Sequence, residues 1–194
     1  MHCETVADTI LGTSEWRPGS PTHREAIRLL LGLADAGAIT DHDDFLRGLA
    51  HQCVDLVPAI AATVLVTDAT VRSIGYGAYP GWAQAERVLC LTGPVLEASR
   101  TGAAVEVLDL DSSSRWPSFP SLTRRYGINA VRALPIPLGE HRRGAIALLA
   151  KSADFSHAAR ERGALLAEAA GIGLRSWYAL RGPRADQVRD VPAS

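Results

Sequence analysis

Apolar positions in the first third of the chain repeat with the spacing of two helices. The first helix is predicted over residues 22–38, where a capping box at its start satisfies free backbone donors. The second begins at an N-cap, either Thr40 or Asp41, and ends at Pro58, because proline cannot continue a helix. Both helices carry an apolar face, which is typical of helices that cover a sheet.

Apolar segments rich in Val, Ile and Leu predict the strands of that sheet. They lie over residues 59–67, 71–77, 105–108, 130–138 and 144–150. Between them, a helix over 93–100 is expected to stop at Gly102 in the left-handed conformation, and 119–126 forms a helical turn. A long helix over 156–180 completes the pattern. This order predicts an α+β fold, in which a central antiparallel sheet of five or six strands has helices on both sides.

Length and charge place these elements in one domain. Residues 21–181 are expected to fold together, with a flexible arm over 1–20 and a flexible tail over 182–194. The chain has 20 basic and 21 acidic residues, so no global field favours nucleic acid or a membrane surface. No apolar run approaches the roughly 20 residues of a membrane span, and no signal-peptide pattern is present. We therefore expect a cytoplasmic protein.

The segment from Leu91 to Ala150 is the most informative one. It contains L-T-G-P-V-L-E-A, then S-S-S-R-W-P-S-F, then A-V-R-A-L-P-I-P-L-G-E-H-R-R-G-A-I-A-L-L-A. This order resembles the second half of a GAF domain, and the whole resemblance covers about 24–180. It is most similar to the sensory GAF domains of bacterial regulators that often carry an RNA-binding ANTAR module. The resemblance implies a domain that senses and dimerises rather than catalyses.

The residues after the last predicted helix are too few for an ANTAR module, so no direct contact with nucleic acid is expected. Cys90 is a candidate for thiol chemistry, because free methionine-(R)-sulfoxide reductases, a catalytic GAF family, need an attacking and a resolving thiol. Those enzymes place a cysteine where this chain has Val95. The sequence therefore predicts no enzyme and interprets Cys90 as a small buried residue. The histidines lack ligand spacing, so neither a metal nor a cofactor is expected.

Six of the eleven aromatic residues fall between positions 76 and 126. In the GAF pattern this region lies over the sheet, where ligands bind, and aromatic walls with a few polar groups suit a small molecule. The candidate ligand-binding residues are Tyr76, Tyr79, Trp82, Ser113, Arg115, Trp116, Ser118, Phe119, Arg125 and Tyr126. The alternative is that the rings only fill the gap between sheet and loops, which leaves a ligand-free protein–protein interaction module.

The last predicted helix carries two neighbouring apolar seams, each stepping by four and then three residues. A helix on a sheet needs one such face, so the second predicts a homodimer, and GAF relatives often pair their terminal helices in a four-helix bundle. The candidate interface residues are Ile27, Leu30, Ala34, Leu166, Ala170, Gly173, Trp177 and Leu180. The alternative is that the first and last helices pack only on each other within one chain. A small molecule or a signalling protein is the other expected partner.

Overall fold

The computed structural model describes residues 23–35, 37, 39–67, 71–77, 86, 90, 92–139, 142–152 and 155–181. Its helices are α2 (His23–Ala34), α3 (His42–Leu56), α5 (Pro94–Thr101), α6 (Phe119–Arg124) and α7 (His157–Arg181). Its strands are β1 (Ala61–Thr67), β2 (Val71–Gly77), β3 (Val105–Val107), β4 (Ala130–Ile136) and β5 (Arg143–Ala150). The arm over 1–20 and the tail over 182–194 lie outside the described residues.

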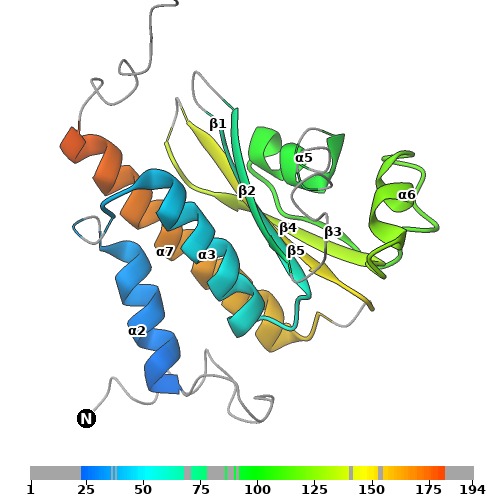
Figure 1. Cartoon of the computed structure of the whole chain (residues 1–194), viewed down its shortest axis with the longest axis horizontal. Coiled ribbons are helices and arrows are strands. Elements are labelled where there is room, and N and C mark those ends of the chain that lie inside the picture. Colours follow the sequence, from blue (N-terminus) through cyan, green and yellow to red (C-terminus); the bar gives the residue numbers. More distant parts are fainter. Residues whose placement is uncertain are drawn as a thin grey trace, which may run out of the picture.

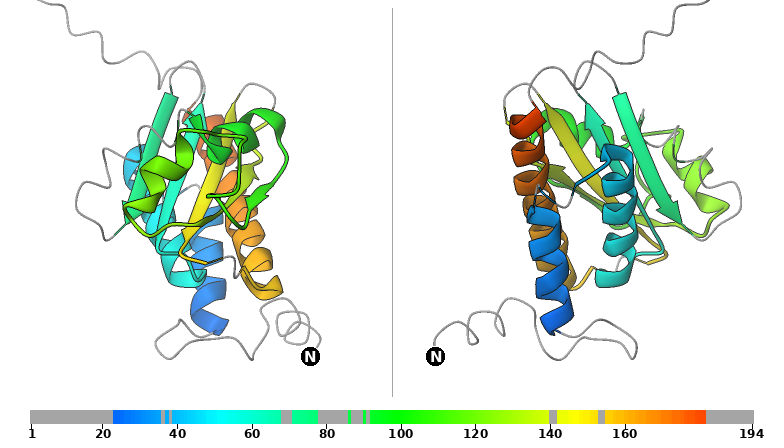
Figure 2. Two further views of the ribbon diagram at one scale, coloured as in Figure 1. Left: turned by 90° about the vertical axis from the view of Figure 1, so that its right-hand side faces the viewer. Right: turned by 60° about the vertical axis from the view of Figure 1, so that its left-hand side comes forward.

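The strands form one antiparallel sheet in the order β2-β1-β5-β4-β3. Helices α2, α3 and α7 lie on one side of it, and α5 and α6 lie on the other (Figure 1). Figure 2 shows α2 running beside α7 rather than against the sheet. The predicted fold class, an antiparallel α+β sheet with helices on both sides, is confirmed.

Alternation along the central strands divides the interior into two cores, because successive side chains of a strand point to opposite faces. On β1, Val64 and Val66 enter the core under α3 and α7, whereas Leu65 enters the core under α5 and α6. On β5, Leu148 and Leu149 divide in the same way. Both strands therefore carry mostly apolar residues on both faces, which explains their long hydrophobic runs in the sequence.

Local signals set several element ends as predicted. Asp41 is the N-cap of α3, and its side chain accepts a hydrogen bond from the backbone N–H of Asp44 at 2.9 Å. Gly102 ends α5 with a φ of 68°, a conformation that disfavours other residues. The first helix ends at Ala34 and not at 38, because Leu33 and Ala34 already meet α7 and the chain then turns towards α3.

A charged cluster fastens α7 to the far edge of the sheet. Glu106 on β3 accepts hydrogen bonds from Arg160 of α7 at 2.8 and 3.1 Å, and it also pairs with Arg132 of β4. These bonds hold the pKa of the Glu106 carboxyl below its ordinary value. The hydrogen bond from Arg160 contributes most to this shift, and burial opposes it. The cluster joins three elements that are far apart in the sequence.

Candidate functional site

The aromatic layer between the sheet and α6 is partly filled by its own rings. Phe119 and Tyr126 are 2 % and 8 % exposed, and both belong to the core under α5 and α6. Trp116 is half-buried and packs against the same core. Phe119 opens α6, and Thr123 turns its hydroxyl back to the Phe119 carbonyl at 3.1 Å, which keeps the short helix closed. These rings line the layer and also stabilise it.

The polar candidates of this layer lie at its surface. Arg115 forms an ion pair with Glu97 of α5, and its guanidinium lies 5.0 Å from the ring centroid of Trp116. Arg125 is exposed and lies 4.8 Å from the ring centroid of Tyr126. The two arginines therefore cover aromatic rings from outside and do not point into the layer.

The remaining candidate residues divide between surface and undescribed positions. Ser113 is half-buried and Ser118 is exposed, and the Ser118 carbonyl accepts a hydrogen bond from the Ser121 hydroxyl. Tyr76 lies on β2, but its side chain is outside the description, as are Tyr79 and Trp82 altogether. The wall that these three residues were expected to form therefore stays a prediction.

A buried carboxyl group and a thiol meet on the same side of the sheet. The Cys90 Sγ lies 3.5 Å from Glu86 Oε1, and the two residues are 0 % and 6 % exposed. Glu86 was missed in the sequence because an i, i+4 pair carries no signal of burial by itself. Val95, where the resemblance to the reductases leads to the expectation of a cysteine, is buried in α5.

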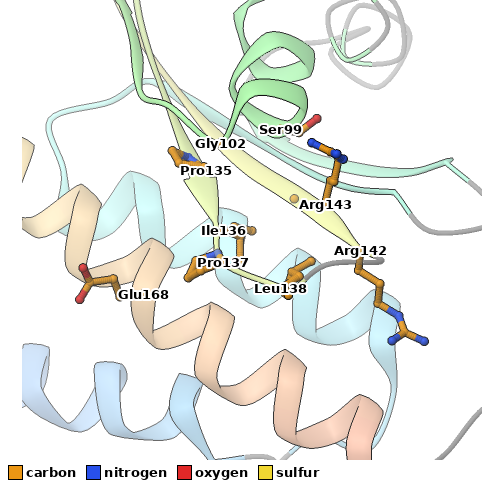
Figure 3. Close-up of a pocket in the computed structure, with 11 residues that line it drawn as sticks. Ser99, Gly102, Pro135, Ile136, Pro137, Leu138, Arg142, Arg143 and Glu168 are labelled. Atoms are coloured by element: carbon orange, nitrogen blue, oxygen red, sulfur yellow. The ribbon is translucent and has the colours of Figure 1, made fainter.

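A groove of about 570 Å³ lies away from this layer, where the sheet edge passes between α5 and α7 (Figure 3). Its walls come from the end of α5, the β4–β5 hairpin and the middle of α7. The lining residues are Ser99, Gly102, Pro135, Ile136, Pro137, Leu138, Gly139, Arg142, Arg143, Gly144 and Glu168. None of them was among the residues that the sequence predicted for ligand binding.

The groove exists because β3 is shorter than β4. Strand β3 pairs only with the first part of β4, and Val105 opposite Ala133 is the last pair. Beyond that point the outer edge of β4 is unpaired, and it carries Pro135, which has no N–H to leave unsatisfied there. Pro135 and Pro137 are visible in the sequence. They line a groove only because β3 ends early, and where β3 ends depends on tertiary structure.

Four residues of the candidate dimer interface are internal. Leu166, Ala170, Gly173 and Trp177 are buried within the single chain, so they offer no surface to a second copy. A Cβ atom on Gly173 would lie 2.0 Å from the carbonyl oxygen of Leu33, which shows how closely α2 crosses α7. The seam packs against α2 and the sheet within one chain, and the homodimer itself stays a prediction.

The other interface candidates divide in a similar way. Leu30 and Ala34 on α2 are half-buried, Leu180 near the end of α7 is 77 % exposed, and the side chain of Ile27 is not described. Large apolar side chains that do face solvent near these helices are Leu31 and Ile172, at 65 % and 47 % exposure. The outward apolar surface is thus made mostly of residues that the sequence analysis did not select.

An aromatic cluster joins the last turns of α7 to the start of α3. The Trp177 indole N–H donates to the carbonyl of Ile39 at 3.0 Å, and His42 Nε2 lies 2.7 Å from the Tyr178 hydroxyl. Arg142 of the hairpin lies over the Tyr178 ring at 4.0 Å from its centroid. His42 thus has a structural role among rings.

Two further observations concern chemistry and location. Among the described residues, no three His, Cys, Asp or Glu side chains gather as a metal site requires. Cys53 is buried in the core under α3, and burial raises the pKa of its thiol to about 12. Each helix in the described part of the chain is too short or too polar to cross a lipid bilayer.

Comparison with known proteins shows the fold but no sequence family. Neither a family model nor a curated protein matches the sequence. A GAF domain/HD domain protein from Geobacter sulfurreducens superposes with a TM-score of 0.58 at 20% identity, over 77% of this chain and 98% of that one. The chain has the GAF fold. The same fold occurs in solved structures of proteins with different roles.

An N-acylhomoserine-lactone-dependent transcription factor of the LuxR family from Burkholderia cenocepacia has a TM-score of 0.58 at 13% identity, over 79% of this chain and 98% of that one. A free methionine-R-sulfoxide reductase from Neisseria meningitidis, solved with its substrate, has a TM-score of 0.56 at 14% identity, over 86% and 96%. The GAF fold thus occurs in both a regulator and an enzyme. The role of this chain therefore has to be inferred from its own residues.

Proposed function

We propose that the chain is a non-enzymatic sensory or regulatory GAF domain that binds a small molecule or a partner protein and forms a homodimer. The support is the GAF fold together with the aromatic layer, in which Trp116 is half-buried and packs against the same core as the buried Phe119 and Tyr126. Because the Trp116 ring is only partly covered and lies next to buried aromatic side chains, it is suited to contact a ligand without loss of the fold.

The small-molecule proposal is tested by analysing the protein purified from its native host for a bound compound by mass spectrometry. Any compound found is then titrated against the variants Trp116→Ala and Phe119→Ala. We expect the Trp116 variant to fold and to lose affinity. The Phe119 variant is the control for a structural role, because removing a fully buried phenylalanine costs about 3–5 kcal/mol. Full affinity in the Trp116 variant would contradict the proposed site.

The alternative function is a protein–protein interaction module without a ligand. The observation in its favour is that Phe119 and Tyr126 already fill the interior, and that Arg115 and Arg125 lie outside over rings. A protein that carries no compound from its host, with the Trp116→Ala variant unchanged in stability and partner binding, would favour this alternative.

The non-enzymatic part of the proposal rests on the thiols. Cys90 is fully buried beside Glu86, and Val95 stands in place of a reductase cysteine. Cys53 lies in the other core, so it cannot resolve a disulfide with Cys90 without unfolding. Incubation with free methionine-(R)-sulfoxide and a thiol reductant should give no methionine, and turnover that is lost in Cys90→Ser would overturn the proposal.

For dimerisation we propose the outward face of α2 and α7, marked by Leu31, Ile172 and Leu180. Exposed apolar side chains of this size on adjoining helices are typical of a contact surface. The double variant Ile172→Glu, Leu180→Glu should run as a monomer of 20.7 kDa in light scattering, whereas the wild-type runs as a dimer. Leu108→Glu, at an exposed leucine outside both helices, is the matched control and should stay dimeric. A monomeric wild-type chain at micromolar concentration would contradict the proposal.

A further inference from the structure

The groove at the β4 edge has opposite charges at its two sides. Figure 3 shows Glu168 on α7 at one side and Arg143 at the other, with Pro135–Leu138 between them. Glu168 is exposed, and its carboxylate forms no ion pair or hydrogen bond with any residue that the structure describes. Arg143 is exposed, points towards α5 and donates one N–H to the Arg100 carbonyl, which leaves four of its N–H groups for another acceptor.

A second positive charge lies near the Arg143 side. Ile136 lies opposite Gly144 in the sheet, so Arg143 is level with Pro137. The Pro137 carbonyl accepts a hydrogen bond from Arg175 of α7. Glu168 precedes Arg175 by two turns on the same face of α7. The Glu168 carboxylate therefore lies at one end of the groove, and the two arginines lie towards the other end.

The edge of the sheet excludes one mode of binding. Pro135 and Pro137 have no N–H, and the Pro137 carbonyl is already engaged by Arg175. An added strand would therefore find too few partners for a hydrogen-bonded ladder. The edge instead offers the apolar surfaces of Pro135, Pro137 and Leu138, so a ligand is held by apolar contact in the middle and by charge at its ends.

From this arrangement we propose that the groove binds a short apolar peptide with free ends, its carboxylate at Arg143 and its amino group at Glu168. Two to four extended residues span about 7–14 Å, which matches the rise of about 10 Å over the two turns of α7 that separate Glu168 from Arg175 beside Pro137. A volume of about 570 Å³ lies within the usual range of ligand pockets. Arginine suits the carboxylate because its planar fork donates two parallel hydrogen bonds. This site is separate from the aromatic layer, so it does not depend on the small-molecule binding proposed there.

The test uses the tripeptide Ala-Leu-Ala and two capped forms, the C-terminal amide and the N-acetyl peptide, in calorimetric titration of the full chain. We expect the wild-type to bind the free tripeptide and each cap to weaken binding at least tenfold. Arg143→Gln should weaken the free tripeptide as much as the amide cap does and should leave the affinity for the amide unchanged. Glu168→Gln should show the same relation to the N-acetyl peptide, because each variant removes the partner of one end.

Two further variants keep the test decisive. Arg143→Lys retains the charge and should recover part of the affinity, which a general loss of structure would not allow. Arg47→Gln, at an exposed arginine of α3 that does not line the groove, should bind like the wild-type. The proposal is overturned if the wild-type does not bind the tripeptide at millimolar concentration, or if capped and free peptides bind equally well.

Discussion

The contact between Gly173 and Leu33 makes a single methyl group a sensitive probe of the helical layer. In Gly173→Ala the new Cβ would lie 2.0 Å from the Leu33 carbonyl oxygen and 3.1 Å from its carbon. Because both atoms are backbone, no side-chain rotation relieves the clash, and α2 has to move away from α7. Movement of α2 withdraws the Leu33 side chain, now 3 % exposed, from the core.

The expected size follows from three terms. Withdrawing a buried leucine loses about 1.5–3 kcal/mol, and weakening the bond from the Trp177 indole to the Ile39 carbonyl loses about 0.5–1.5 kcal/mol. Replacing a glycine within a helix by alanine returns about 1 kcal/mol. The net expectation is a destabilisation of about 1–3.5 kcal/mol, close to the usual range of about 1–3 kcal/mol for overpacking.

Urea unfolding followed by far-ultraviolet circular dichroism measures this difference. The matched control is Gly48→Ala in α3, where a new Cβ meets no atom within 4 Å. That variant should gain about 0.5–1 kcal/mol from helix propensity alone. If Gly173→Ala were as stable as Gly48→Ala, the close crossing of α2 and α7 would be wrong.

Three further predictions address single groups. Glu106→Gln should be less stable than the wild-type at neutral pH. Because the folded-state pKa of Glu106 is depressed, the carboxylate's contribution to the free energy of unfolding is present above the ordinary carboxyl range and is lost as pH falls through the folded pKa. The free energies of unfolding of the two proteins should therefore converge in acid. In the Cys3→Ser, Cys90→Ser variant, Cys53 should not react with Ellman's reagent at pH 8 until the chain is unfolded, since its pKa is raised to about 12; reaction in the native state would contradict its burial. Leu49→Ala, at a fully buried position of α3, should cost about 2–5 kcal/mol in the same unfolding measurement, and a loss below 1 kcal/mol would place Leu49 outside the core.

Local signals in the sequence were sufficient for most of the fold. The oxygen of Asp41 and the missing side chain of Gly102 act within a few residues, so the positions they set did not depend on the rest of the chain. The strand over 71–77 was also predicted with the bounds that the structure has. Each of these cases rests on chemistry that is complete within one turn or one segment.

The candidate sites were harder to predict because they depend on distant contacts. Gly173 fits an interface seam by spacing, yet its missing Cβ serves a crossing with Leu33, 140 positions earlier in the chain. The groove depends on the length of β3, and no residue in 105–107 indicates from sequence alone that the pairing of β3 with β4 stops at Ala133. The ion pairs of Glu106 likewise join segments whose proximity only the fold creates.

Three glycines of α7 determine which face of this helix a second copy can reach. A Cβ on Gly163 would meet Leu134 of β4 at 2.9 Å, and one on Gly171 would meet Pro137 at 2.8 Å, so the helix is held against the sheet over two turns. With α2 against Gly173, the face around Ile172 is the one left open.

Since α2 is positioned by this packing, the place of Leu31 relative to Ile172 depends on the crossing at Gly173. We therefore expect Gly173→Ala, which lies outside the proposed interface, to weaken dimerisation together with stability, whereas Ile172→Glu should abolish dimerisation and leave the unfolding free energy of the monomer nearly unchanged. Equilibrium sedimentation combined with urea unfolding separates the two effects. A Gly173→Ala chain that is destabilised yet dimerises with wild-type affinity would show that α2 takes no part in the contact.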